Sequence, residues 1–116
     1  RYEPVCERLL REDAQGHDMI LRNAKAVLLI HTPQASRFGC QDANLAYQNG
    51  SLMAECLGVS QFYTGFVCSA IQQDRKSHLE KMLGIEGQIH AGMALGMPAF
   101  RYVNYIDRLG LRENTL

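Results

Sequence analysis

Residues 42–59, DANLAYQNGSLMAECLGV, decide the fold because they predict the longest helix of the chain. Asp42 is a residue type favoured at helix N-caps, and Gly58 is the type favoured just beyond helix C-termini. Between them, one face of the predicted helix carries mostly apolar side chains at spacings of three and four residues. That face consists of Leu45, Ala46, Asn49, Leu52, Met53, Cys56 and Leu57.

Small residues also repeat along this helix. Ala46, Gly50 and Ala54 are spaced four residues apart, so they form a flat strip on the helix surface. A glycine inside a helix costs about 1 kcal/mol relative to alanine, and a close neighbour that needs the space would compensate for that cost. The neighbour could be a second chain, a planar ligand or another part of the same core. The spacing leaves self-association and internal packing both open.

The residues upstream predict a helix and then a strand. Residues 2–11 have apolar side chains at helical spacing, and residues 13–16 (DAQG) are expected to end that helix. Residues 26–31 (AVLLIH) are rich in leucine and β-branched residues and predict a buried strand, which Pro33 ends. Residues 34–41 are polar and predict a loop that leads into the long helix.

Downstream, the residues predict a short extended segment, two short helices and a strand. Residues 59–66 are extended and bring three aromatic side chains close to Gly65, and residues 66–72 form a turn or two of helix. Residues 77–80 (SHLE) match a capping box, and Gly84 closes the helix that it begins. Residues 88–95 alternate with a period of two and predict a strand. Its richer apolar face is Ile89, Ala91, Met93 and Leu95.

Composition limits what this chain can be. It has 116 residues, 47% hydrophobic and 21% charged, which predicts one soluble globular domain spanning residues 1–116. Twelve basic side chains balance twelve acidic ones, so the surplus positive charge that nucleic-acid binding needs is missing. The longest apolar run, residues 26–30, is far shorter than a membrane span. The pattern of a secretory signal does not occur, and we therefore expect a cytoplasmic protein without membrane or nucleic-acid partners.

No side-chain pattern in the sequence predicts a catalytic centre. The four histidines and four cysteines lack metal-ligand spacing, so we predict no metal site, and we expect the cysteines to be reduced thiols. Cys56, on the apolar helix face, is expected to be a buried and inert thiol. Phosphate-binding glycine loops, serine-nucleophile motifs and paired carboxylates do not occur. The chain is then either not an enzyme or an enzyme whose chemistry belongs to an organic cofactor.

A family resemblance favours the cofactor. Residues 42–59 resemble the long central helix of the nitroreductase family of flavoproteins, and further motifs keep the family's order and spacing over roughly residues 18–108. These motifs are Asp18 with Ile20, Arg22 and residues 24–27 before a strand, then Gly65-Phe66, Leu83-Gly84-Ile85 and residues 94–98 (ALGMP). The chain is most similar to anaerobe-type members that carry a ferredoxin-like iron-sulfur region upstream, although that iron-sulfur motif does not occur here.

The resemblance implies an α+β fold in which helices flank an antiparallel sheet. It also implies a homodimer, paired through the helix Asp42–Leu57, that holds FMN at its interface and passes electrons from NAD(P)H to nitro compounds, quinones or similar acceptors. Phe62, Tyr63, Thr64 and Gly65 match the segment whose backbone approaches the flavin ring, where an N–H group meets flavin N5. Arg108 matches the basic residue that binds the FMN phosphate, and Arg101 is the reserve candidate. The resemblance assigns no catalytic acid or base to a side chain.

The sequence departs from the family in three places. Met97 replaces a common tyrosine, and Lys25 stands where proline is frequent. The chain also lacks the upstream arginine-containing segment and the loop that contact FMN, so we expect a C-terminal portion of the flavin domain, incomplete at its N-terminus. The alternative is a non-catalytic dimerisation or small-ligand-binding module that has lost the cofactor. A cysteine-based redox role is a third hypothesis.

Overall fold

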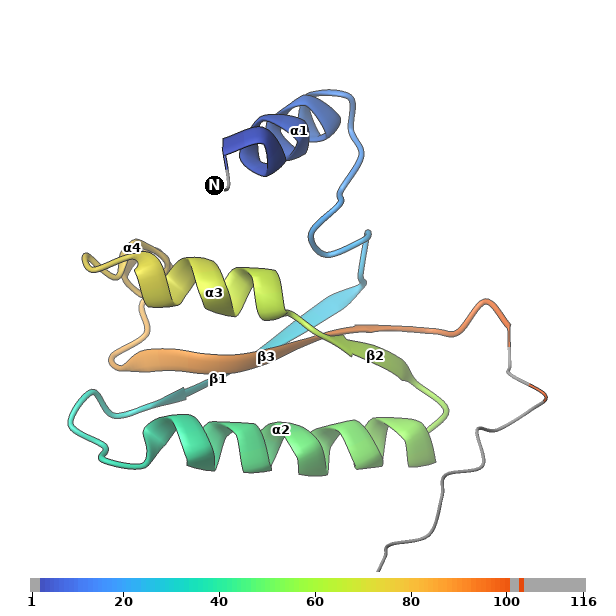
Figure 1. Ribbon diagram of the computed structural model, residues 1–116. Coiled ribbons are helices and arrows are strands. Elements are labelled where there is room, and N and C mark those ends of the chain that lie inside the picture. Colours follow the sequence, from blue (N-terminus) through green and yellow to red (C-terminus); the bar gives the residue numbers. More distant parts are fainter. Residues whose placement is uncertain (1–2, 101–102, 104–116) are drawn as a thin grey trace, which may run out of the picture.

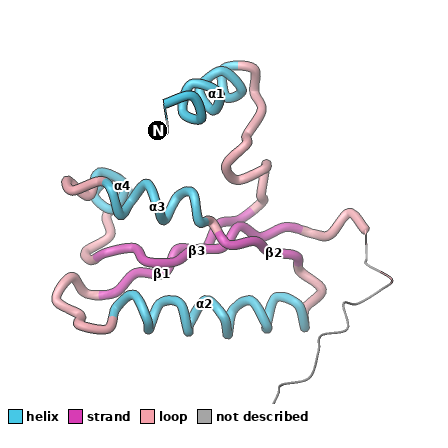
Figure 2. Tube along the Cα trace, viewed as in Figure 1, coloured by secondary structure: helices cyan, strands magenta, loops and turns pink. Residues whose placement is uncertain are grey.

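The computed structural model describes residues 3–100 and residue 103 (Figure 1). Its elements are α1 (Glu3–Ala14), β1 (Ala26–Thr32), α2 (Gly39–Cys56), β2 (Ser60–Tyr63), α3 (Gly65–Gln73), α4 (His78–Leu83) and β3 (Gln88–Gly96). The three strands form one antiparallel sheet in the order β1-β3-β2. Helix α2 covers one face of the sheet, and α3 and α4 lie on the other (Figure 2). The expected α+β fold with helices flanking an antiparallel sheet is confirmed.

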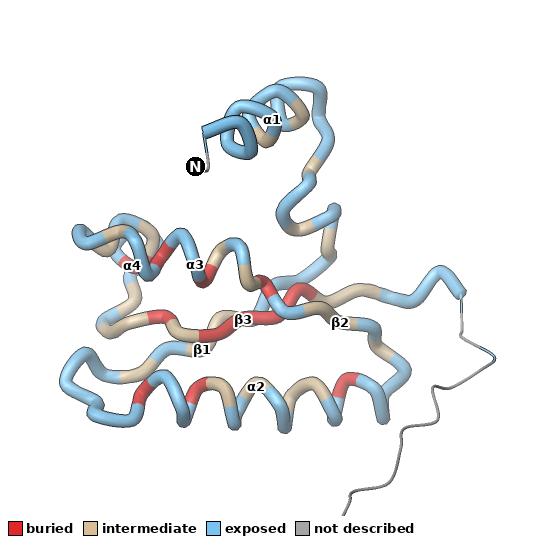
Figure 3. Tube along the Cα trace, in the orientation of Figure 1, coloured by how far each residue is buried: buried red, intermediate tan, exposed pale blue. Residues whose placement is uncertain are grey.

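Strand β3 holds half of the buried hydrophobic residues in the described part of the chain. It is the central strand, with a helix on each side, and its Ile89, Ala91, Met93 and Ala94 are buried (Figure 3). The register with β1 shifts at His90, which has no partner opposite it, because Ile30 pairs with Ala91 and His31 with Ile89. The bulge lies just before residues 91–94, which are all buried because α2 packs on one face of β3 and α3 on the other. The strand was predicted correctly, but its burial does not follow one alternating face.

Strand β1 is found where the sequence predicts it, but it is not buried. Val27 and Leu28 remain 40% and 44% exposed. The reason is the position of the strand: β1 lies at the edge of the sheet, and among the described elements α2 packs against it while α3 lies over β3. The prediction of a buried strand was therefore wrong for this part of the chain.

Helix α2 begins earlier than predicted. Its first residue is Gly39 and its N-cap is Phe38. Asp42 lies in the first turn, where its carboxylate interacts favourably with the positive end of the helix dipole. The predicted C-terminus is confirmed. Gly58 has a φ of 71°, its N–H donates to the Glu55 carbonyl at 3.0 Å, and the chain leaves the helix there.

The face of α2 that packs on the sheet is not the predicted apolar face but the one opposite to it. Ala43 and Ala54 are buried against the sheet, and a Cβ on Gly50 would lie 2.9 Å from Met93 Cε, so Met93 fills the space that the glycine leaves. Internal packing thus accounts for Gly50 and Ala54, whereas Ala46 is exposed. The large side chains of the predicted apolar face point away from the sheet: Leu45, Leu52, Met53 and Leu57 are 67%, 58%, 60% and 69% exposed. Cys56 is also exposed, which corrects the prediction of a buried thiol.

The predicted capping box of α4 does not form. Ser77 has a φ of 51° and makes no side-chain cap, and the Glu80 side chain turns into the core, where Oε1 accepts the Ile89 N–H at 3.4 Å. Asp74 replaces the serine, because its carboxylate accepts the N–H groups of Lys76 at 3.0 Å and His78 at 2.7 Å. Gly84 ends the helix with a φ of 67°, as predicted.

Smaller differences concern the helix ends. Helix α1 continues to Ala14, through the first half of the predicted break, and ends before Gly16, which has a φ of 79°. Helix α3 runs from Gly65 to Gln73 and confirms the predicted helical turns. The loop predicted at residues 34–41 is shorter, because its last residues belong to α2.

Replacing Gly92 with alanine should destabilise the protein. A Cβ at this position would lie 2.6 Å from Thr64 Oγ1, 2.9 Å from Leu29 Cδ2 and 3.1 Å from the Leu28 carbonyl oxygen. We expect Gly92→Ala to lower the free energy of unfolding by about 1–3 kcal/mol, measured by urea denaturation. Gly96→Ala is the matched control on the same strand, because a Cβ there meets open space. Equal effects of both substitutions would contradict the packing argument.

Candidate functional site

The four residues predicted to approach a flavin ring lie at the junction of β2 and α3. Phe62 and Tyr63 end the strand, Thr64 is the N-cap of the helix, and Gly65 is its first residue. All four line one cavity of about 270 Å³. The rest of that cavity comes from α1, the loop before β1 and the first turn of α3: Val5, Leu9, Met19, Ile20, Arg22, Phe66 and Val67.

Thr64 anchors this junction to the central strand. It is 2% exposed, and its N–H donates to the Gly92 carbonyl at 3.0 Å. Its hydroxyl lies 4.0 Å from Cys68 Sγ and does not cap the helix. The first N–H groups of a helix have no partners inside the helix, so those at the start of α3 can donate to a group in the cavity.

Tyr63 presents a neutral phenol beside the junction. Its ring meets Tyr47 edge to face, with the ring centroids 4.9 Å apart, and its hydroxyl donates to the His90 carbonyl at 3.4 Å. Burial raises the pKa of Tyr63 to about 12, with a smaller contribution from the nearby Cys68 thiol. The phenol therefore stays protonated at neutral pH and serves as a hydrogen-bond donor.

A polar network that the sequence analysis missed ties α2 to β2. The Tyr47 hydroxyl donates to Gln61 Oε1 at 2.6 Å, and Gln61 Nε2 donates to Ser51 Oγ at 2.8 Å. Tyr47 and Ser51 are four residues apart, on the side of α2 that faces the sheet. That spacing was a signal in the sequence, but the apolar pattern of the opposite face obscured it.

Arg22 also lies at the site, although the sequence did not assign it there. Its guanidinium carbon lies 5.7 Å from the centre of the Phe62 ring, within cation–π range. The loop that carries it is held by Asp18, whose carboxylate accepts the N–H groups of Ile20, Leu21 and Asn23 at 3.0, 2.8 and 3.1 Å. The hydrogen bond from Leu21, followed by that from Asn23, lowers the pKa of Asp18.

Several predictions concern residues or groups away from the junction. Arg108, and Arg101 as its reserve, lie outside the described residues. Within residues 3–100 and 103, no cluster of three or more histidine, cysteine or acidic side chains could hold a metal ion. All four cysteines are free, with Cys68 buried and Cys6, Cys40 and Cys56 exposed. No helix in the described part of the chain is long and apolar enough to cross a membrane.

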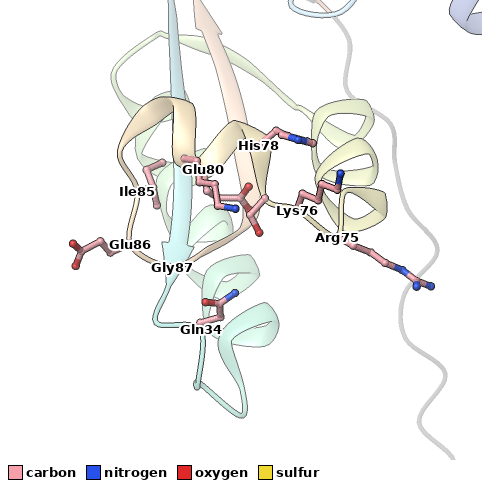
Figure 4. A pocket seen from close by; sticks show the side chains of 10 residues that line it. Gln34, Arg75, Lys76, His78, Glu80, Ile85, Glu86 and Gly87 are labelled. Atoms are coloured by element: carbon pink, nitrogen blue, oxygen red, sulfur yellow. The ribbon is translucent and has the colours of Figure 1, made fainter.

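A polar cavity lies at the other end of β3, beside α4 (Figure 4). It measures about 610 Å³, and its rim carries charges of both signs, including Arg75, Lys76 and Glu86. Arg75 and Glu86 point to opposite sides, so the charges do not converge on one ligand position (Figure 4). Glu80 also lines the cavity, and its Oε2 is buried without a hydrogen-bond partner among the described residues. The β2–α3 junction is therefore the better candidate site.

An antiparallel sheet between helices defines an α+β protein, and the aromatic-lined cavity at an uncapped helix start is its candidate small-molecule site. Comparison with known proteins narrows this class. The sequence profile described as Nitroreductase family matches residues 1–97, and the chain belongs to that family. No curated protein matches the chain.

A solved structure shares the fold of this chain. It is a nitroreductase with bound FMN from Bacteroides fragilis NCTC 9343, with a TM-score of 0.65 and 16% sequence identity. The match covers 91% of this chain and 59% of that chain. The present chain thus spans about three fifths of the length of that nitroreductase.

The Asp18 loop predicts a dependence of stability on pH. The pKa of Asp18 in the folded protein lies below its usual value of 3.8. The ionised carboxylate therefore stabilises the folded state above pH 3.8, and this contribution is lost as the pH falls through the folded pKa. We expect the urea midpoint to fall less steeply in Asp18→Asn than in the unmodified protein between neutral pH and about pH 3. Asp13→Asn is the control, because the Asp13 carboxylate is exposed and accepts no hydrogen bond in the described structure. Identical pH slopes in all three proteins would contradict the role of Asp18.

Proposed function

We propose that this chain belongs to an FMN-dependent oxidoreductase of nitroreductase type, which passes electrons from NAD(P)H to nitro compounds, quinones or similar acceptors. The observation that carries the proposal is the β2–α3 junction, where free N–H groups at a helix start open onto a cavity lined by aromatic residues. Family membership and the FMN bound by the related Bacteroides protein support it.

The residues at the junction fit the ring of a flavin. At Gly65, the nearest atoms to an added Cβ belong to the Tyr63 ring, at 3.3 and 3.6 Å, so the other side of the residue is open to a close ligand. Phe62 and Tyr63 would hold the ring, and an N–H group at Thr64 or Gly65 would donate to flavin N5. Since Thr64 N–H already donates to Gly92, the Gly65 N–H is the better donor. Arg108 remains the proposed phosphate ligand.

The residues of this chain would bind and shield the cofactor. When bound, FMN supplies the hydride and electron transfer, so no side-chain acid or base is required. The hydrogen bond from Thr64 N–H to Gly92 holds the junction against β3. Tyr63 remains neutral because its pKa is raised, so its side chain adds no charge beside the flavin ring. The apolar lining from α1 and α3 would limit access of water.

The exposed face of α2 is the proposed dimer contact. Leu45, Leu52, Met53 and Leu57 form an apolar surface that residues 3–100 do not cover. Contiguous apolar surface of this kind marks contact sites in soluble proteins. A second copy would pair with the helix predicted at Asp42–Leu57, and the family resemblance supports FMN binding at that interface. The same surface is also what the rival, a non-catalytic dimerisation module, would use.

FMN binding separates the two hypotheses. After incubation with FMN and desalting, the protein should keep the visible absorption band of oxidised flavin. Gly65→Val should weaken FMN binding at least about tenfold, because its Cβ would lie 3.3 Å from the Tyr63 ring and would displace a ring that is proposed to hold the flavin. The urea midpoint of this variant reports any loss of stability separately. Gly96→Ala, in open space on β3, should bind FMN normally. A colourless protein that still dimerises would favour the non-catalytic module.

Charge on the outer face of α2 should disrupt the dimer. Met53→Glu places a carboxylate in the proposed contact, and we expect a shift from dimer to monomer in sedimentation velocity without loss of helical circular dichroism. The control is Gln72→Glu, on the exposed side of α3. If Met53→Glu sediments like the unmodified protein, α2 is not the contact.

A further inference from the structure

The Arg22–Phe62 pair lies between two cavities. One is the 270 Å³ cavity at the β2–α3 junction, and the other measures about 430 Å³ and lies beside the ends of the three strands. Arg22 and Phe62 line both cavities. A ligand in either space would therefore meet the same guanidinium and the same aromatic ring.

The charge of Arg22 is not neutralised within the described structure. The ion pairs there join His17 to Glu12 and His78 to Asp74, and no carboxylate pairs with Arg22. The guanidinium instead lies over the Phe62 ring. A guanidinium held near an aromatic ring by this attraction keeps its N–H donors, and their fork matches the two oxygens of a carboxylate.

The loop places Arg22 before any ligand arrives. Arg22 and Asn23 have φ values of 54° and 56°, a conformation that non-glycine residues adopt rarely. The three hydrogen bonds to Asp18 hold the loop in this conformation. A cation held in advance loses less freedom on binding than one on a mobile loop.

The surfaces around Arg22 select the rest of the ligand. Next to the guanidinium, the smaller cavity presents the side chains of Met19, Ile20, Phe66 and Val67. Such surfaces favour a flat apolar group. We infer that the Arg22–Phe62 pair binds a planar aromatic carboxylate, with its carboxylate on Arg22 and its ring against Phe62 and Phe66. This ligand would share the 270 Å³ cavity with the proposed flavin ring and would therefore compete with FMN there, a consequence that rests on the proposed function, whereas the binding itself does not.

The test compares a charged ligand with its neutral isostere. The probes are 2-naphthoate and 2-naphthamide, titrated by calorimetry into the full chain without added FMN. We expect naphthoate to bind about tenfold more tightly, the gain typical of one charge-assisted contact, and Arg22→Gln to abolish that preference. Equal affinities in the unmodified protein, or a preference that survives Arg22→Gln, would overturn the inference.

Arg37→Gln is the matched control. Its guanidinium carbon lies 5.4 Å from the centre of the Phe38 ring, so it makes the same kind of cation–π contact, but Arg37 lines neither cavity. The preference for naphthoate should survive this substitution, and its loss would also overturn the inference. If Arg22→Gln fails to fold by circular dichroism, Arg22→Lys replaces it, and we expect part of the preference to remain because the charge stays while the fork is lost.

FMN retention, measured separately on the same protein, distinguishes the two proposals. Arg22-dependent naphthoate binding by a protein that retains no FMN would support the anion site and remove the proposed function. Retained FMN with no discrimination between the probes would overturn the anion site alone.

Discussion

The contact between Thr64 and Gly92 fixes the geometry of the junction. The Thr64 N–H donates to the Gly92 carbonyl, and the Thr64 hydroxyl occupies the space that a side chain at position 92 would need. The chain therefore changes from strand to helix within one residue. Because of this short transition, the start of α3 comes directly beside the aromatic end of β2. The candidate site depends on a tight backbone approach more than on any reactive side chain.

The other side of the sheet is organised by side-chain size. Met93 fills the space above Gly50, and α2 can lie close to β3 because the residues facing it are small. The large apolar side chains of α2 are consequently left on the outer surface. Within the described chain the core relies heavily on alanines, with Ile89 as a large, fully buried side chain. A proposed second copy would bury the apolar area that the described part of the chain leaves uncovered.

The sequence predicts the elements better than it predicts their environment. Period and end signals located α2, β1 and β3, because these depend on nearby residues. These signals did not predict which face of α2 packs on the sheet. The large apolar side chains of α2 point outward, and the face with small residues packs on the sheet. The capping box failed for a similar reason: Asp74 caps α4, which leaves Glu80 to turn toward Ile89.

The site was predicted in part, through the family resemblance. The resemblance assigned Phe62, Tyr63, Thr64 and Gly65 to the site, and the structure places all four around one cavity. Their contact with FMN is a proposal. Arg22 was not assigned, because its position over Phe62 depends on a loop whose hydrogen bonds join residues up to five apart with no regular period. The Tyr47–Gln61–Ser51 network was missed as well: the spacing of Tyr47 and Ser51 places them on one face of α2, but no local pattern marks Gln61 as their partner.

The position of β1 has a consequence for how the protein behaves in solution. One side of this strand pairs with β3, and in the described chain no strand pairs with the other side. Its outer N–H and C=O groups thus form a template on which another extended chain can add. Lys25 before the strand and Pro33 after it are residue types that discourage such addition. Between them lie the exposed Val27 and Leu28, which favour aggregation along this edge at high concentration.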